Sequence, residues 1–326
     1  MTMQTDLLAW YYANARQLAF RKNQDPYCIW ISEIMAQQTR IEAMLPYYER
    51  FMALYPDLPS LAQADDEQLH KAWEGLGYYS RCRNLKKCAV QCMEQYEGRL
   101  PATKEELKKL PGIGEYTAGA IASIAYKEKV SAVDGNVIRI FSRLYDIHLD
   151  VTKAAGKRKI SELVEESLCD PIEYYNQALM ELGALICTPK SPKCDLCPVA
   201  RYCRTTDPES LPVKPKKKER KIVRKKIYVL TDGSRIHMVK RGPDGLLANM
   251  YEFDETPPAE YERMESLGQY THIFSHVEWH MDAQMLYVKE GDNFYTIDQI
   301  ENELAVPSAF MPFFEEAREK LEKEIE

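Results

Sequence analysis

The sequence predicts a mainly α-helical first domain followed by a smaller α+β domain. Residues 1 to about 200 divide into helix-length segments separated by short Gly/Pro signals, and four cysteines lie together at residues 187–203. A basic stretch at residues 212–226 follows, and the pattern then changes to short strand-like runs. A chain of 326 residues can bury two hydrophobic cores. We therefore expect domains at residues 1–211 and 227–326, joined by a linker at residues 212–226.

The helical elements show ordinary start and stop signals. Between residues 60 and 75 the apolar positions recur at near-helical spacing, and a Gly-Leu-Gly turn ends that segment. Thr103 has a glutamate three residues later, Glu106, which is the pattern of a capping box. The second domain is expected to contain strands at residues 227–230, 235–239 and 285–288, and a charged helix at residues 310–326.

Charge is distributed unevenly between the two predicted domains. The chain has a net charge of −7, but residues 1–226 carry +6 and residues 227–326 carry −13. A basic first part is compatible with DNA binding, because the local field matters more than the total charge. An acidic, solubilising tail domain beside a neutral enzyme would give the same numbers. The nine Lys and Arg residues between Lys214 and Lys226 fit either a solvated tether or a tether that also contacts phosphates.

The sequence gives no sign of membrane association. Its apolar runs are short, and its first residues have neither a basic region nor an apolar core of the kind found in secretory signals. We expect no membrane anchor and a cytoplasmic location close to the genome, or the nucleus if the organism is eukaryotic.

Four cysteines, Cys187, Cys194, Cys197 and Cys203, follow the spacing C-x6-C-x2-C-x5-C. Four thiolates in so short a loop can surround one metal centre, and by softness they suit zinc or an iron–sulfur cluster equally. Zinc ribbons usually have two C-x2-C pairs, whereas this loop has one. The spacing resembles the iron–sulfur loop of the endonuclease III superfamily of DNA glycosylases, which implies a [4Fe-4S] cluster.

Residues 110–120, LPGIGEYTAGA, place a Gly-x-Gly turn between two helical segments. Gly112 and Gly114 would let a DNA phosphate approach the backbone N–H groups at the start of the next helix. With the preceding Leu-Pro, the segment resembles the helix-hairpin-helix motif of the same superfamily. That superfamily places an essential aspartate some twenty residues later, which corresponds to Asp134; Asp134 would also cap the next helix.

Bifunctional members of this superfamily cut the DNA backbone with a lysine in the hairpin, in the pattern Leu-Pro-Gly-x-Gly-x-Lys. Here that position is Tyr116, and the next lysine is Lys127. A lyase that works through a Schiff base is therefore disfavoured.

Several further motifs resemble MutY-type adenine DNA glycosylases over nearly the whole chain. They are WISEIMAQQTR at residues 30–40, GLGYYSRCRNL at 75–85, VDGN at 133–136, GLLANMYEF at 245–253 and FSH at 274–276. The last two resemble the domain that recognises oxidised guanine, which is similar to a Nudix hydrolase without its active site. Met250 and Tyr251 depart from the Leu-Trp expected there. The resemblance predicts a helix-hairpin-helix glycosylase domain followed by a Nudix-like domain.

The resemblance also implies roles at the reaction centre. Glu33 would be the general acid that protonates adenine, and Asp134 would stabilise the oxocarbenium-like sugar. Tyr116 and Asn136 would position groups around these two carboxylates. The expected reaction is hydrolysis of the N-glycosidic bond of an adenine that has been flipped out of the DNA stack.

A second group of residues would hold the DNA. Gln38 and Tyr78 occupy wedge positions, and Thr39 and Ser275 correspond to contacts with the oxidised guanine. Arg40, Gly112, Gly114, Phe274 and His276 complete the expected DNA-binding set. The expected partner is double-stranded DNA with an adenine opposite 8-oxoguanine or guanine, bound by a monomer.

Three alternatives remain from the sequence alone. The first is a glycosylase for another lesion, such as a thymine mismatch, against which the Phe-Ser-His segment argues. The second is a non-catalytic DNA-binding protein on the same scaffold, which would not need both Glu33 and Asp134. The third is a structural zinc protein, which absorbance near 400 nm in the purified protein would exclude.

Overall fold

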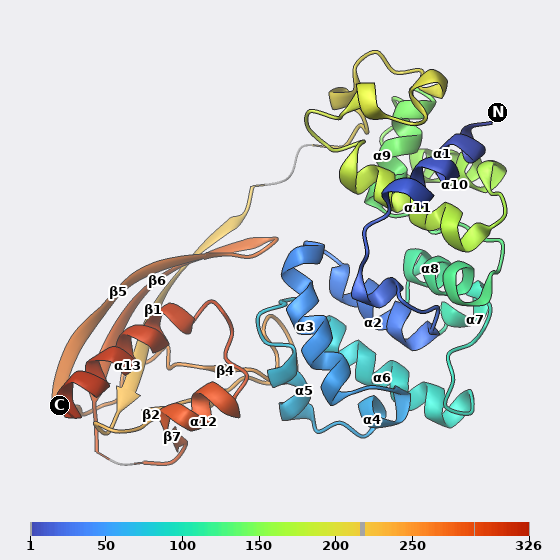
Figure 1. The fold of residues 1–326 in the computed structure, drawn as a ribbon. Coiled ribbons are helices and arrows are strands. Elements are labelled where there is room, and N and C mark those ends of the chain that lie inside the picture. The colour runs from blue at the N-terminus through green and yellow to red at the C-terminus, as the bar shows by residue number, and fades with distance from the viewer. Residues whose placement is uncertain (1, 216–218, 290, 326) are drawn as a thin grey trace. The chain divides into compact units, whose positions relative to one another are not determined.

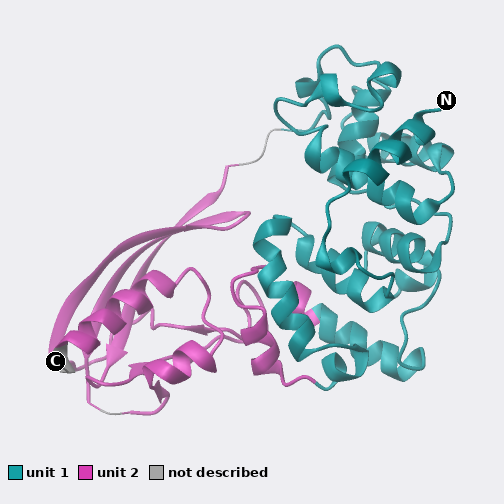
Figure 2. Cartoon of the chain, in the orientation of Figure 1, with its two compact units in different colours: residues 1–63, 84–216 teal, residues 64–83, 217–326 magenta. Residues whose placement is uncertain are grey.

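The computed structural model describes residues 2–215, 219–289 and 291–325. The chain forms two compact units (Figure 2), and each is described here by itself. The first contains residues 1–63 and 84–216. The second contains residues 217–326 together with residues 64–83, a stretch that the sequence places in the helical domain.

The first unit is helical, as predicted (Figure 1). Its helices are α1 (Met3–Asn14), α2 (Pro26–Ala36), α3 (Ile41–Leu54), α4 (Leu58–Ala62), α7 (Lys104–Leu107), α8 (Glu115–Tyr126), α9 (Gly135–Leu144), α10 (Ala154–Ser167) and α11 (Ile172–Leu185), with short 3-10 helices at Ala19–Arg21, Cys194–Leu196, Ala200–Tyr202 and Pro208–Ser210. Helix α6 (Ser80–Gln95) begins in the second unit and continues into the first. Thr103 caps α7 by accepting a hydrogen bond from the backbone N–H of Glu106.

Packing around α11 brings the ends of α2, α8 and α9 together. One face of α11 packs against α1 and α9, and α11 also packs against α8, which in turn packs against α2. Buried side chains of α1, α9, α10 and α11 include Leu7, Phe141, Ile160, Tyr175 and Leu182, all at most 1% exposed. Because α2, α8 and α9 all touch this common framework, their termini open onto one region of the unit.

The second unit is α+β, as predicted. Its elements are α5 (Asp66–Ala72), β1 (Lys221–Thr231), β2 (Ile236–His237), β3 (Val239–Lys240), β4 (Tyr251–Glu252), β5 (Arg263–Ile273), β6 (Val277–Tyr287), β7 (Phe294–Tyr295), α12 (Ile297–Asn302) and α13 (Met311–Ile325). Five strands form a sheet in the order β5-β6-β1-β2-β7, and β3 pairs with β4. Strands β1 and β6 run parallel over eleven residue pairs, whereas β5 and β6 form an antiparallel hairpin.

Alternation along β6 explains why this sheet has one covered face. Val277, Trp279 and Met281 are buried, whereas Glu278 and His280 between them retain exposed surface. The buried side chains pack against apolar residues of α12, α13 and the segment between them, which form one core. The opposite face is polar at this end of β6 and carries a smaller apolar cluster, Tyr228, Leu230 and Leu286, farther along the sheet.

The structure corrects two expectations about boundaries. The predicted linker at residues 212–226 is shorter, because Val213 accepts a hydrogen bond from Val151 in the first unit and residues 221–226 already belong to β1. Lys216, Lys217 and Lys218 lie outside the described residues. The apolar run at residues 60–75 is also divided, because Asp65 caps a separate helix, α5. Among the helices the structure describes, none has the length and apolar character needed to span a membrane.

Candidate active site

Helix α2 carries Glu33 on the wall of a cleft. The helix begins sharply at Pro26, because Asp25 accepts hydrogen bonds from the backbone N–H groups of Tyr27 and Cys28 at 2.8 and 3.1 Å. Most of α2 is buried, and Trp30 is fully so. Glu33 is the acidic residue of this helix and keeps part of its surface open to the cleft.

The glycine turn before α8 places Tyr116 beside Glu33. Gly112 has a φ of +78°, and a Cβ there would lie 2.7 Å from the Cβ of Asn84, so this position requires glycine. Gly114 caps α8, and Tyr116 follows in the first turn of the helix. The Tyr116 hydroxyl donates to Oε2 of Glu33 at 2.5 Å. The predicted hairpin is thus present, and it delivers a side chain to the predicted acid.

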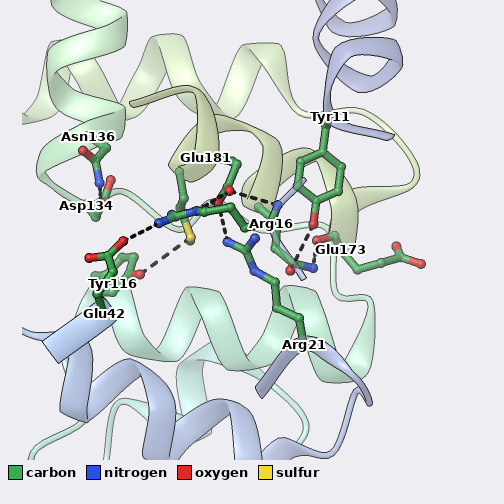
Figure 3. Close-up of polar contacts among 11 residues, drawn as sticks. Tyr11, Arg16, Arg21, Glu42, Tyr116, Asp134, Asn136, Glu173 and Glu181 are labelled. Atoms are coloured by element: carbon green, nitrogen blue, oxygen red, sulfur yellow. Dashed lines mark hydrogen bonds and ion pairs between the residues drawn. The ribbon is translucent and has the colours of Figure 1, made fainter. Parts of the chain in front are cut away.

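Asp134 caps α9, as the sequence indicates. Its Oδ1 accepts a hydrogen bond from the N–H of Val137 at 2.8 Å, and its Oδ2 accepts one from Nδ2 of Asn136 at 2.7 Å. Figure 3 shows Asn136 beside Asp134 at the edge of the site. Two donors on one carboxylate favour its ionised form.

One cleft of about 1350 Å³ brings the predicted residues of the first unit together. The predicted residues that line it are Glu33, Gln38, Thr39, Arg40, Gly112, Gly114, Tyr116, Asp134 and Asn136. Gln38, Thr39 and Arg40 form the turn between α2 and α3, where Gln38 adopts a φ of +59° and stays exposed. The nine come from three separate segments of the sequence, residues 33–40, 112–116 and 134–136, yet they share this single opening.

The electrostatics of the cleft distinguish its two central carboxyl groups. Burial raises the pKa of Glu33 to about 7; the Tyr116 hydrogen bond opposes this shift and the charge of Asp134 adds to it. Burial also raises the pKa of Asp134, but its bonds from Val137 and Asn136 work in the opposite direction. Burial and the two carboxylates hold the pKa of Tyr116 well above its usual value, so Tyr116 remains a hydroxyl donor. Glu33 is the group that can carry a proton at neutral pH.

A buried ionic cluster, which the sequence analysis did not predict, forms another wall of the cleft. Glu181 on α11 has no exposed side-chain surface and binds Arg16 at 2.6 Å and Arg21 at 2.8 Å (Figure 3). Burial alone would raise the pKa of Glu181, but its bonds from Arg16 and Arg21 bring it below the usual value. The only local signal was a glutamate between buried apolar positions of α11. Its partners lie about 160 residues earlier, where no short motif could reveal them.

Hydrogen bonds along α9 connect Asp134 to the cysteine loop. Nη2 of Arg139 donates to Oδ1 of Asn136 at 2.8 Å, and its Nε donates to the carbonyl of Cys187 at 2.7 Å. Gly183 on α11 makes room for this arrangement, because a Cβ there would lie 2.4 Å from the Cβ of Asn136. Arg139 and Gly183 are site-supporting residues that the sequence motifs did not single out.

The four cysteines surround one cavity of about 300 Å³. Within the described residues, no three His, Cys, Asp or Glu side chains close on the position of a single metal ion. Arg143, which is 2% exposed, donates to Sγ of Cys187 at 3.3 Å and to the carbonyls of Thr188 and Pro189. A cavity of this size, ringed by four thiols and a guanidinium that favours thiolates, fits a multi-atom anionic cluster.

The remaining predicted residues lie in the second unit. Tyr78 has a φ of +49° and is 44% exposed. Phe274, Ser275 and His276 form the turn between β5 and β6. Phe274 packs on Trp279, with ring centroids 4.8 Å apart, and leaves Ser275 and His276 exposed.

Comparisons with known proteins agree with this geometry. The family model for the HhH-GPD superfamily of base excision DNA repair proteins matches residues 31–166, and that for the iron-sulfur binding domain of endonuclease III matches residues 187–203. The adenine DNA glycosylase of Rattus norvegicus is 43% identical over 210 residues, which cover 61% of this chain and 40% of that protein. The adenine DNA glycosylase of Schizosaccharomyces pombe is 32% identical over 324 residues, covering 77% of this chain and 70% of that protein.

Among solved structures, a thermostable thymine-DNA glycosylase superposes with a TM-score of 0.57 and 26% identity, covering 61% of this chain and 93% of that one. The fold and the cysteine loop define a helix-hairpin-helix base excision repair protein with an iron–sulfur binding domain. Within that class, the chain belongs to the MutY-type adenine DNA glycosylase family. It spans less than half the length of the rat protein.

Proposed function

We propose that the protein is a monofunctional DNA glycosylase that removes adenine mispaired with 8-oxoguanine or guanine. The observation that carries this proposal is the pairing, in one cleft, of a carboxylic acid with a pKa of about 7 and a second carboxylate held by two N–H donors. Hydrolysis of a glycosidic bond needs such a pair, one group to protonate the leaving base and one to stabilise the sugar cation.

Glu33 supplies the proton. Adenine leaves poorly as an anion, so protonation at N7 lets the electron pair of the bond to C1′ remain on a neutral base. Tyr116 holds the Glu33 carboxyl group at 2.5 Å and fixes its orientation. Asp134 faces the positive charge that develops on the sugar. Water then forms the new bond to C1′ and its released proton returns to Glu33, which restores the acid.

The cluster of Glu181, Arg16 and Arg21 on the wall of the cleft can recognise the base. The amino group and N1 of adenine present one donor and one acceptor side by side. Glu181 is fully buried, but it holds Arg21 at 2.8 Å on the wall of the cleft, where the guanidinium can donate an N–H bond to N1 of the base. A base with the opposite pattern, such as guanine at its N1 and O6 positions, would place donor against donor.

The DNA is held by residues of both units. Backbone N–H groups at Gly112 and Gly114 and the side chain of Arg40 fit phosphates. Gln38, Thr39 and Tyr78 open the stack around the lesion, and Phe274, Ser275 and His276 contact the base opposite the adenine. The working form is a monomer located with the genome.

Cys187, Cys194, Cys197 and Cys203 would hold the [4Fe-4S] cluster, which supplies cross-links that fix the loop at residues 187–203. Arg143 and Arg139 join this loop to α9, and thereby to the cap residue Asp134. The chain's own residues carry out every step of the hydrolysis.

The test is single-turnover incubation with duplexes that carry one adenine opposite 8-oxoguanine, guanine or thymine, and one thymine opposite guanine. Products are examined with and without alkali. We expect rapid loss of adenine opposite 8-oxoguanine, slower loss opposite guanine, and strand scission only after alkali. Scission without alkali would contradict the monofunctional assignment, and preferential release of thymine would contradict the choice of base.

A further inference from the structure

The C-terminal end of α5 and the residues just after it are held by α12 and the residues that follow α12. Nζ of Lys71 donates to the carbonyls of Ile300 and Leu304 at 3.3 and 2.9 Å, and it pairs with Oε2 of Glu74 at 2.6 Å. The other oxygen of Glu74 accepts a hydrogen bond from the backbone N–H of Val306 at 3.1 Å. A cation near carbonyls at the end of a helix is favourable. Lys71 and Glu74 thus form a two-residue clamp, here called the α5 clamp.

Other contacts within the same unit also hold α5 and the start of α6. Lys240 pairs with Glu67 at 2.5 Å, and Arg83 donates to the carbonyl of Ala248 at 3.3 Å. These bonds explain why residues 64–83 group with residues 217–326 (Figure 2). The α5 clamp differs from them in position, because Lys71 and Glu74 directly precede the glycine loop.

The loop that presents Tyr78 rests on this end of α5. Trp73 lies between the two clamp residues in sequence, is fully buried, and donates from its indole N–H to the carbonyl of Gly77 at 3.1 Å. Arg81 donates to the carbonyls of Leu76 and Gly77 at 2.9 and 3.1 Å. Its guanidinium lies 5.3 Å from the Trp73 ring centroid and 5.6 Å from that of Tyr78. The backbone between Lys71 and Glu74 therefore joins the clamp to Trp73, whose contacts and those of Arg81 hold Gly77 and Tyr78.

We propose that Lys71 and Glu74 are positioning residues through which the C-terminal domain fixes the conformation of the Tyr78 loop. This inference rests on the function proposed above. It means that the turn at residues 274–276, which contacts the base opposite the adenine, and Tyr78, which opens the stack, are held in one rigid arrangement before DNA binds. Tyr78 has a left-handed backbone, which is costly for a tyrosine and must be maintained by its surroundings. The clamp supplies part of that support from residues more than 200 positions away in sequence.

The direct test is hydrogen exchange of the amides at residues 75–79 in the full-length protein. Lys71→Met keeps the length of the side chain and removes its charge and its donors. We expect exchange at residues 75–79 to become about tenfold faster, the effect of losing one or two hydrogen bonds that oppose local opening. Lys71→Arg, which keeps a cation, should restore most of the protection. Lys289→Met, an exposed lysine of the same unit, is the matched control and should change nothing.

A kinetic cycle then separates positioning from general stability. Lys71→Met should slow adenine release, but in a Tyr78→Ala background it should have no further effect, because the residue that it positions is gone. Unchanged exchange at residues 75–79, or effects of the two substitutions that simply add, would overturn the inference. Faster exchange in Lys71→Met, together with no release of adenine by the wild-type protein, would instead support the α5 clamp and refute the proposed function.

Discussion

In the proposed reaction, Glu33 is the residue whose protonation state would set the pH range in which the site works. Its pKa of about 7 arises from burial, and it places a proton donor at neutral pH where an exposed glutamate would be ionised. We expect the single-turnover rate of adenine release to be constant below pH 7 and to fall about tenfold per pH unit well above it. Rates measured from pH 5 to 9 test this. Glu33→Gln should be slower by a factor of about 100 or more and should lose this dependence.

The same shift predicts a gain in stability when Glu33 is replaced. The folded protein binds this proton more tightly than the unfolded chain does, because the pKa rises from 4.5 to about 7 on folding. Stability is therefore lost as pH rises between these values, and the loss is complete above pH 7. Glu33→Gln removes the carboxyl group whose ionisation causes this loss. The variant should therefore be more stable than the wild type at pH 8 by up to about 3 kcal/mol. Urea unfolding at pH 4 is the control, where the difference should vanish.

At the scale of elements, the hairpin before α8 contains two glycines with different predicted roles, Gly112 in the fold and Gly114 in DNA binding. Gly112 has both a positive φ and a close neighbour, whereas a Cβ at Gly114 meets open space. Gly112→Ala should lower the free energy of unfolding by about 1–3 kcal/mol. Gly114→Ala should change it by less than about 0.5 kcal/mol and still weaken DNA binding, because its Cβ would obstruct a phosphate. Unfolding and binding curves for the two variants check this, and equal loss of stability in both would contradict it.

Helix α9 begins at the cap residue Asp134 and carries Arg143, whose side chain binds residues 187–189 of the cysteine loop. Arg143→Met should leave the carbonyls of Thr188, Pro189 and Leu211, of which the last is buried, without the donor that Arg143 supplies. We expect a loss of about 3 kcal/mol in stability and less iron per chain. Thermal unfolding and iron analysis measure both. Arg158→Met on the exposed face of α10 is the matched control, and an unchanged iron content in Arg143→Met would refute the anchoring role.

At the scale of the whole molecule, the features that could be predicted from the sequence are those whose residues all lie within one short segment. Glu33, the hairpin, Asp134 and the cysteine loop each sit in a local pattern whose spacing reflects one helix end or one loop. The pairing of Glu181 with Arg16 and Arg21 had no such pattern, because its members come from separate elements. The grouping of residues 64–83 with residues 217–326 was hidden for the same reason.

The linker shows a different limit of sequence reasoning. Lys221, Arg224 and Lys226 make residues 221–226 look like a solvated tether, yet these residues pair with β6 and form the first half of β1. Alternation along the strand places Arg224 and Lys226 outward and Val223 toward the core. Long-range strand pairing therefore overrode the local composition.

The central claim is that one cleft releases free adenine by the joint action of Glu33 and Asp134. The most direct measurement is chromatographic quantification of free adenine from a duplex with adenine opposite 8-oxoguanine, using the wild type, Glu33→Gln and Asp134→Asn under single turnover. The wild type should release one adenine per duplex, while both variants bind the duplex but release adenine at least about 100-fold more slowly. Release at the wild-type rate by either variant would contradict the assignment of that carboxyl group to the reaction.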